Sequence, residues 1–191
     1  IRNCYVWAPE ATDYATGTLA GVRTAAENVA NRNSDYFTLE GSTIEGGYQG
    51  AYIDGASYTV LPKLRGALVK GNTFIGQGSV GIYSTKVNET ILEDNHIIGS
   101  GRVANHYKAI DAVLTGSTTI RGNKIEIHDL EAVGKYRELN ALHLRGGSVA
   151  ENTPGRNLIY NNELRLTADN HPSAVYGIYF SDAHIGKADI L

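Results

Sequence analysis

The sequence predicts an all-β solenoid in which short parallel strands form about five to six stacked coils. Three observations predict it. A ten-residue pattern of apolar and turn residues recurs five times, the 191-residue chain carries 22 glycines, and no long helical periodicity follows residue 34. One such repeat buries little surface by itself. The hydrophobic residues, 42% of the chain, therefore form a continuous core only if the repeats stack.

Residues 1–35 differ in character from the repeats, and we expect them to cap the first coil. Thr16 or Thr18 can cap a short helix that begins at residue 19, with Leu19, Val22 and Val29 on one side. A cap has a physical reason, because an uncovered first coil exposes apolar core and an unpaired strand edge. The chain is thus divided into an N-terminal cap segment, 1–35, and β-solenoid repeats, 36–191.

The recurring pattern places one apolar residue on each side of a polar turn. The five copies occupy 37–46, 67–76, 90–99, 118–127 and 158–167. The apolar residues before the turn are Leu39, Val69, Leu92, Ile120 and Ile159, and those after it are Ile44, Phe74, Ile97, Ile125 and Leu164. Between them lie Ser42, Asn72, Asn95, Asn123 and Asn162. Stacked asparagines can hydrogen-bond along the stack, so we assign them a structural role.

A second set of strands lies between the first ones. Its inward positions are Ile53, Ile82, Ile110, Leu142 and Ile178, and strand alternation adds Ala112, Leu144 and Phe180. Each repeat therefore contributes two or three short strands to the stack. The chain lacks methionine altogether and no capping helix follows its last strand. We therefore expect the repeats to continue in a longer, exported protein.

These motifs resemble a known family. A Gly-Ile-Tyr strand followed by Ile-x-x-Asn-x-Ile is similar to the repeat of the right-handed parallel β-helix superfamily, which includes pectate lyases, polygalacturonases, alginate epimerases and phage tailspikes. The resemblance covers about residues 36–182 and implies that fold. It does not imply one activity. The polygalacturonase-like Asn-Thr-Asp, Asp-Asp and Gly-His-Gly set and the epimerase-like Asp-Pro-His-Glu motif are both missing from the sequence.

Composition excludes several classes of protein. No run of 18 apolar residues is present, so no segment spans a bilayer as a helix. A net charge of −3 with both signs scattered argues against a general nucleic-acid binder. The single cysteine excludes an internal disulfide and a cysteine-based zinc cluster. No histidines show metal-ligand spacing; we expect no cofactor, and a Ca²⁺ site stays open without named ligands.

Candidate chemistry lies on the outward-facing positions of the second strand set. The residues next to its inward positions form one external row: Asp54, Tyr83, Asp111, His143 and Tyr179. Two positions further along come Thr85, Val113, Arg145 and Ser181. Neighbouring coils are about 4.8 Å apart, so Asp111 and His143 are adjacent. Loops before these strands add His106, Lys108, Tyr136 and Arg137 as candidate substrate-binding residues, together with Asp54.

Such a row suits an acidic polysaccharide. In a lyase, Arg145 or Lys108 would meet the uronate carboxylate, His143 oriented by Asp111 would act as base, and Tyr83 or Tyr179 as acid. In a glycoside hydrolase, Asp54 and Asp111, about 9.6 Å apart, would form the carboxyl pair. Pairing of Asp111 with Asp182 or Glu138 is a further option.

Three hypotheses follow. The first is a secreted or surface-bound protein that binds and cleaves or modifies an acidic polysaccharide, as a lyase or a hydrolase. The second is a tailspike-like fibre on a virion, which would form homotrimers. The third is a structural or adhesive surface protein, in which the row is only cross-strand pairing that stabilises a parallel sheet.

Overall fold

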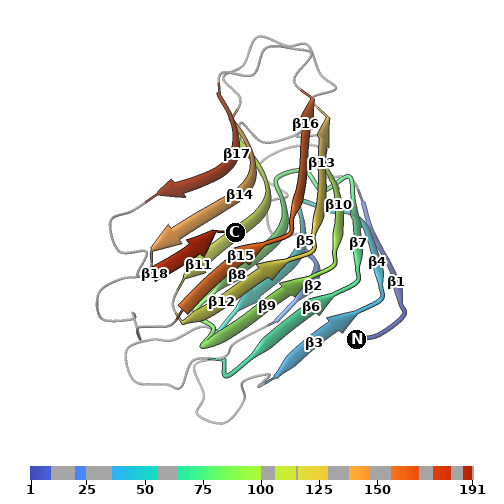
Figure 1. The fold of residues 1–191 in the computed structure, drawn as a ribbon. Helices are drawn as coiled ribbons and strands as arrows, with labels where there is room; N and C mark the ends of the chain where they lie inside the picture. Colours follow the sequence, from blue (N-terminus) through green and yellow to red (C-terminus); the bar gives the residue numbers. More distant parts are fainter. Residues whose placement is uncertain are drawn as a thin grey trace.

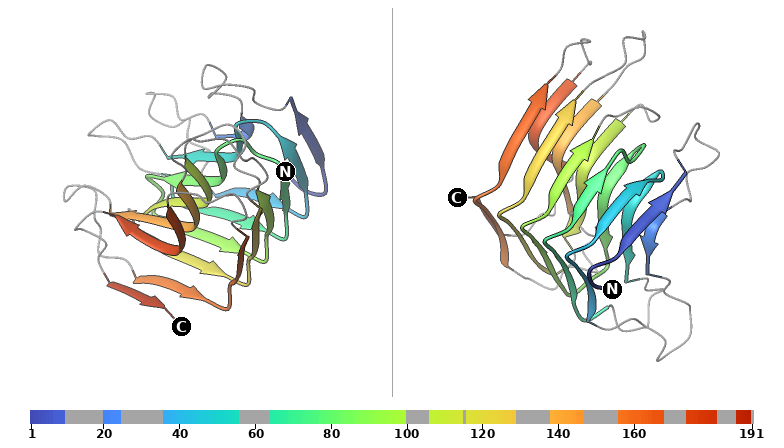
Figure 2. Two further views of the ribbon diagram at one scale, coloured as in Figure 1. Left: turned by 90° about the horizontal axis from the view of Figure 1, so that it is seen from above. Right: turned by 90° about the vertical axis from the view of Figure 1, so that its right-hand side faces the viewer.

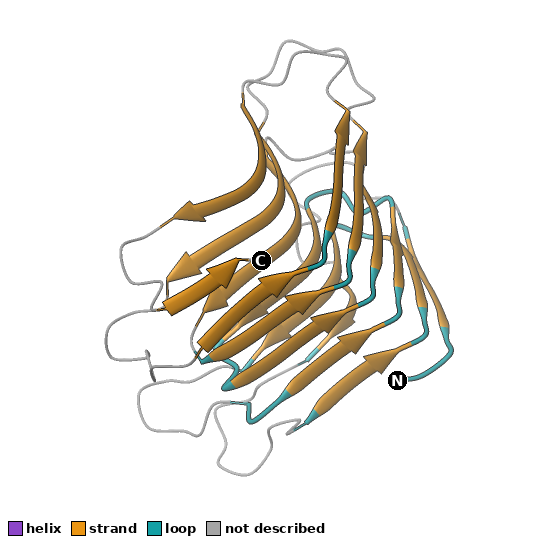
Figure 3. Ribbon diagram, viewed as in Figure 1, coloured by secondary structure: helices purple, strands orange, loops and turns teal. Residues whose placement is uncertain are grey.

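The computed structural model describes residues 1–9, 20–24, 36–55, 64–99, 106–114, 116–128, 138–146, 156–167, 174–181 and 187–190. Its described residues form eighteen strands in three parallel sheets of six strands each. Figure 1 shows the three sheets wrapped around one interior, and Figure 3 shows that the described elements are strands. This arrangement is a parallel β-helix of six coils, as the repeats predict.

Each coil contributes one strand to each sheet, and each sheet is named after its first strand. The β1 sheet contains β1 (Tyr5–Ala8), β4 (Thr43–Gly46), β7 (Thr73–Ile75), β10 (His96–Gly99), β13 (Lys124–His128) and β16 (Glu163–Thr167). The β2 sheet contains β2 (Ala20–Arg23), β5 (Gln49–Asp54), β8 (Val80–Thr85), β11 (His106–Leu114), β14 (Glu138–Gly146) and β17 (Ala174–Ser181). The β3 sheet contains β3 (Phe37–Glu40), β6 (Ala67–Lys70), β9 (Glu89–Glu93), β12 (Ser117–Arg121), β15 (Arg156–Tyr160) and β18 (Lys187–Ile190). Figure 2 shows the coils stacked in chain order.

The two predicted core columns are confirmed by the strand register. On the β3 sheet, Leu39 pairs with Val69 and Val69 with Leu92, and the column continues through Ile120 and Ile159. On the β1 sheet, Ile44 pairs with Phe74, and the column continues through Ile97, Ile125 and Leu164. All but the terminal Leu164 are buried. Burial of branched side chains in continuous columns is therefore the main stabilisation of the stack.

The predicted asparagine ladder is present between the β3 and β1 sheets. Both the backbone N–H and the side-chain Nδ2 of Asn72 donate to Asn95 Oδ1, at 3.1 and 3.0 Å, and Asn95 donates to Asn123 in the same way. Asn95 Nδ2 also donates to the carbonyl of Val69 at 2.9 Å. The residue before each ladder position has a positive φ: Gly41, Gly71, Asp94, Gly122 and Asn161. This left-handed turn explains why Gly, Asp or Asn recurs there.

The predicted register of the second strand set is correct from β8 onward and wrong in β5. Ile82, Ile110, Leu142 and Ile178 pair in succession. In β5, however, Ala51 pairs with Ile82, whereas Ile53 pairs with Ser84. A shift of two residues keeps each side chain on its own face, so Ile53 still points inward. Asp54 consequently lies beside Thr85 and not beside Tyr83, and Tyr52 takes its place in the external row.

Part of the predicted cap helix is also wrong. Ala20–Arg23 form strand β2, which pairs with β5 in the β2 sheet. Here tertiary pairing overrides the helical pattern, because the exposed edge of β5 offers backbone hydrogen bonds along the stack. The rest of the expected helix lies outside the described residues. Within the described part of the chain, no helix has the length and apolarity that crossing a membrane requires.

The long strands of the β2 sheet bend, and the bend decides which side chains share a face. In β11, Ala109 and Ile110 are both fully buried, so the strict alternation of faces is broken between Lys108 and Asp111. Lys108 and Asp111 therefore share the outer face although three positions separate them. Figure 1 shows β11, β14 and β17 as curved strands.

Candidate functional site

The outer face of the β2 sheet carries a continuous row of aromatic and ionisable side chains. In register, Tyr52 pairs with Tyr83, Tyr83 with Asp111, Asp111 with His143 and His143 with Tyr179. Although they lie outside the barrel core, Asp111 is only 4% exposed and His143 only 6% exposed. The row therefore contains two buried polar groups, each of which needs hydrogen-bonding or ionic partners.

Asp111 is the centre of this row. Arg145 Nε lies 2.9 Å from Oδ1 and Arg145 Nη2 lies 3.2 Å from Oδ2, which makes a bidentate pair. Lys108 Nζ lies 3.1 Å from Oδ2. On the other side, His143 Nδ1 lies 3.2 Å from Oδ1. One carboxylate thus has two cations and an imidazole around it.

These neighbours determine the ionisation of the cluster. Burial alone would raise the pKa of Asp111, but the contact with His143 and the charges of Lys108 and Arg145 outweigh it, so the pKa is lowered. For Arg145, burial works to lower the pKa, and the Asp111 charge outweighs it and raises the pKa. Asp111 is therefore a carboxylate and Arg145 a guanidinium at neutral pH.

His143 joins Asp111 to Ser181. Its Nε2 lies 2.8 Å from Ser181 Oγ, two positions further along the neighbouring strand than its register partner Tyr179. The Nδ1 atom is close to Asp111, but the contact does not meet hydrogen-bond geometry. The ring of Tyr179 stacks on the imidazole, with 5.2 Å between centroids and 12° between planes. This stacking limits the ring positions that His143 can take.

Further aromatic contacts extend the row in both directions. Tyr52 and Tyr83 stack with centroids 4.9 Å apart, and Tyr176 stacks on Tyr179 at 4.7 Å. The guanidinium of Arg145 lies 5.7 Å from the Tyr83 ring centroid, within cation–π range. Burial and the neighbouring Asp54 charge raise the pKa of Tyr52, so its phenol stays protonated at neutral pH.

A cavity of about 380 Å³ lies beside this row. It is lined by residues of the segment before β5, and of β5, β8, β11 and the turn before β8: Tyr48, Gln49, Tyr52, Ser79, Val80, Tyr83, His106, Lys108 and Asp111. Its lining therefore combines tyrosine rings with a lysine, a histidine and a carboxylate. Glu138, which does not line the cavity, contacts His106: its Oε2 lies 3.4 Å from His106 Nδ1.

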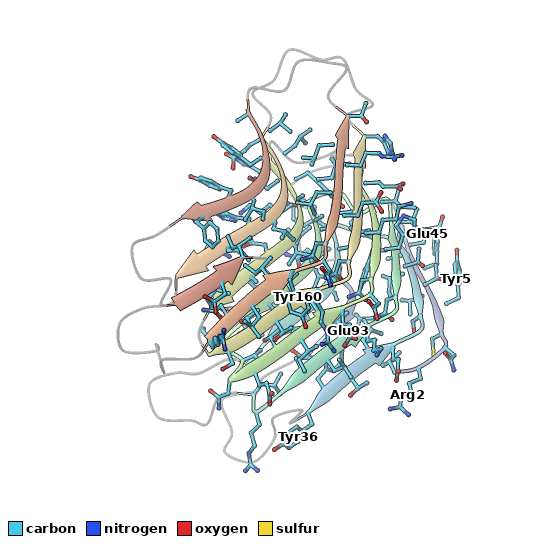
Figure 4. All side chains as sticks on the ribbon, in the orientation of Figure 1. Arg2, Tyr5, Tyr36, Glu45, Glu93 and Tyr160 are labelled. Carbon is cyan, nitrogen blue, oxygen red and sulfur yellow. The ribbon has the colours of Figure 1, made fainter. Side chains whose placement is uncertain are left out.

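The outer face of the β3 sheet offers a comparison. Arg121 contacts Glu93 at 2.9 Å and donates to Tyr160 Oη at 2.9 Å, while Lys70 lies 3.4 Å from Glu93. Figure 4 shows Glu93 and Tyr160 on this face. The two cations there are about 40% exposed, and this row is an ordinary surface ladder. By contrast, the Asp111 cluster is buried.

The structure brings together most of the residues predicted for the site. Asp111, His143, Tyr83, Tyr179 and Arg145 lie in one cluster, and His106 and Lys108 line the cavity. Asp54 lies beside Thr85 and not beside Tyr83, so its predicted place in the external row is wrong. Tyr136, Arg137 and Asp182 lie outside the described residues. Glu138 holds His106 and Asn140, not Asp111.

Sequence reasoning missed three functional candidates. Ser181 lies on the predicted outer face, but alternation along strands does not indicate its contact with His143, which runs diagonally across strands. Tyr52 was displaced by the two-residue error in β5. Tyr48 precedes the strand, and only the cavity reveals it. A register search that allows even shifts would have found Tyr52.

Few candidate metal ligands lie together in the described part of the chain. No group of three or more His, Cys, Asp or Glu side chains that could hold a metal ion occurs in the described part of the chain. Cys4 is exposed and its Sγ contacts the Arg2 carbonyl. The sequence contains no methionine, so the thioether ligand that favours Cu(I) is unavailable within this chain.

Comparisons with known proteins place the chain in a family. Neither the curated proteins nor the solved structures contain a match to it. Residues 9–184 match the family model described as "Periplasmic copper-binding protein (NosD)". This match covers all but the ends of the chain and agrees with the parallel β-helix, which supports the superfamily but not a pectate-lyase-like identity. The chain belongs to the NosD family.

Proposed function

We propose that this protein binds an acidic polysaccharide on the outer face of the β2 sheet. The observation that carries the proposal is the cavity of about 380 Å³, in which three tyrosines lie beside Lys108 and His106. Aromatic faces suit the C–H surfaces of sugar rings, and cations suit uronate carboxylates. A cavity of this size lies in the range of small-molecule sites.

The cavity lining contains two kinds of group that would contact a sugar acid, the tyrosine rings and the ammonium of Lys108. Tyr52 and Tyr83 are stacked on each other, which holds both rings in place before a ligand binds. Lys108 Nζ donates to Asp111 and has further N–H groups, since an ammonium has three. Asp111 fixes the direction of this ammonium, and the remaining donors are available to an anionic ligand.

Cleavage by β-elimination is the finer version of this proposal. It would use His143 as base, Arg145 or Lys108 to meet the carboxylate, and Tyr83 or Tyr179 as acid. Both cations already contact Asp111, and His143 Nε2 already contacts Ser181. To act as base, His143 Nε2 would have to leave Ser181, so the geometry supports binding more directly than elimination.

Copper is the ligand that the family description names. The donor set does not fit it: the described residues contain no suitable group of metal ligands, and the whole chain has one cysteine and no methionine. We therefore derive no chemistry from copper. The family description does support a location on the outer side of the cytoplasmic membrane, where polysaccharides are exposed. A homotrimer stays a prediction.

The test is a calorimetric binding panel of uronate polymers and neutral polymers of matched length, with absorbance of unsaturated ends followed in parallel. We expect binding of an acidic polymer and about tenfold weaker binding by Lys108→Ala, which loses one charge-assisted contact. Lys70→Ala, a lysine paired with a carboxylate on the β3 sheet, is the matched control and keeps full affinity. Equal weak binding of acidic and neutral polymers would contradict the proposal.

A further inference from the structure

Three side chains on adjacent strands of the β2 sheet form a linked series. Asp111 lies on β11, His143 on β14 and Ser181 on β17. Asp111 Oδ1 is 3.2 Å from His143 Nδ1, and His143 Nε2 is 2.8 Å from Ser181 Oγ. A hydroxyl within hydrogen-bonding distance of an imidazole that faces a carboxylate is the geometry of an activated serine.

The negative charge of Asp111 favours the His143 tautomer that carries its proton on Nδ1. Asp111 is ionised, so its Oδ1 can accept a hydrogen bond from Nδ1–H once the ring is aligned. Nε2 is then the basic nitrogen and accepts from the Ser181 hydroxyl. The incomplete alignment at Nδ1 resembles unliganded sites, in which such bonds often tighten only on substrate binding.

Position and exposure also suit a nucleophile. Ser181 is the last residue of β17 and is half-buried, whereas His143 and Asp111 are buried behind it. Tyr179 stacks on the imidazole and holds its plane. Here a buried base is oriented from one side and contacts an accessible hydroxyl on the other.

We infer that Ser181 is the nucleophile of a carboxylic ester hydrolysis, with His143 as general base and Asp111 as its orienting residue. Ser181 Oγ attacks the ester carbonyl carbon as its proton passes to His143 Nε2. The carbon–oxygen bond to the alcohol breaks, and the leaving oxygen takes that proton. Water then attacks the acyl-serine, gives a proton to Nε2, and releases the carboxylic acid while Ser181 recovers its hydrogen.

The substrate class is an acyl ester on a carbohydrate hydroxyl, such as an O-acetyl group. This part rests on the proposed function, because the cavity lined by tyrosines lies on the same outer face as Ser181. Two strand spacings, about 9.6 Å, separate β11 from β17. A polysaccharide that runs from the cavity across β14 to β17 would therefore reach Ser181. Ester hydrolysis itself does not depend on that ligand.

The experiment uses two small probes on the whole chain. A fluorophosphonate should modify wild-type protein at Ser181, located by peptide mass mapping, and hydrolysis of p-nitrophenyl acetate should fall at least about 100-fold in Ser181→Ala and in His143→Gln. Ser117→Ala, which removes an exposed strand serine on the β3 sheet, should keep full labelling and hydrolysis.

Several outcomes would overturn the inference. Labelling spread over exposed serines, or absent at Ser181 in protein with its native circular dichroism, contradicts it even if His143→Gln fails to fold. So does hydrolysis unchanged in a folded Ser181→Ala variant. Acetate release from an acetylated acidic polymer tests the carbohydrate part separately. Labelling at Ser181 without polymer binding would refute the proposed function and leave the serine chemistry in place.

Discussion

Replacement of Asp111 by asparagine should destabilise the fold strongly. The carboxylate makes two contacts with Arg145, at 2.9 and 3.2 Å, and contacts Lys108 at 3.1 Å and His143 at 3.2 Å. With Asp111 only 4% exposed, Asp111→Asn leaves Arg145 half-buried without its counter-charge. Breaking such a pair costs about 3–5 kcal/mol. That is about a third or more of a typical unfolding free energy.

The stability difference between wild type and Asp111→Asn should also depend on pH. The folded-state pKa of Asp111 is lowered, so its contribution is present above the unfolded pKa of about 3.9 and is lost as pH falls through the folded value. Urea unfolding at pH 7 should therefore separate wild type from Asp111→Asn by about 3 kcal/mol or more. The separation should shrink as the pH falls toward 2.

A matched control keeps this test specific. Glu163→Gln neutralises an exposed carboxylate on β16 and should change stability by less than about 0.5 kcal/mol at any pH. If Asp111→Asn unfolds at the same urea concentration as wild type at pH 7, the cluster does not stabilise the sheet, and the reasoning about a buried, charge-paired carboxylate is refuted.

Two further predictions concern the stack itself. Asn95→Ala removes the acceptor of two Asn72 donors and the donor to a buried carbonyl, so it should cost about 3 kcal/mol in urea unfolding, whereas the exposed Asn88→Ala should cost less than 0.5. No difference between these two variants would show that the ladder contributes nothing. Gly99→Ala should reduce the free energy of unfolding by about 2 kcal/mol and so lower the melting temperature. The reason is that the added methyl group would overlap the fully buried Tyr107 ring. Gly177→Ala meets only ordinary contacts and should be tolerated; equal melting of both glycine variants would contradict the packing.

The core of the fold could be predicted from the sequence because the repeat carries its own register. Each ladder position follows a turn residue with positive φ, and this fixed turn aligns Leu39 with Val69 and every later pair. Sequence periodicity therefore predicted the stacking columns, the asparagine ladder and the number of coils. Where the turn pattern is absent, as before β5, the pairing register can shift by two residues without changing which side chains face inward. The alternation of apolar residues therefore cannot detect such a shift.

The candidate site was only partly predictable for related reasons. Alternation along each strand, with the repeats aligned, predicted that Asp111 and His143 are neighbours. It could not show that they are buried or that two cations surround Asp111. The bend at Ala109 places Lys108 on their face, and the diagonal contact adds Ser181. The helix expected from residue 19 is wrong over Ala20–Arg23, because pairing with β5 outweighs local propensity there.

Binding of an acidic polysaccharide in the tyrosine-lined cavity over β5, β8 and β11 can be measured directly. The most direct measurement is the dissociation constant of one uronate oligosaccharide for wild type, Tyr83→Ala and Tyr160→Ala. Tyr83 lines the cavity, whereas Tyr160 lies on the β3 sheet. We predict binding by wild type and Tyr160→Ala and affinity about five- to tenfold lower for Tyr83→Ala, from the loss of about 1 kcal/mol of ring contact. Equal affinities for the two tyrosine variants would contradict the account.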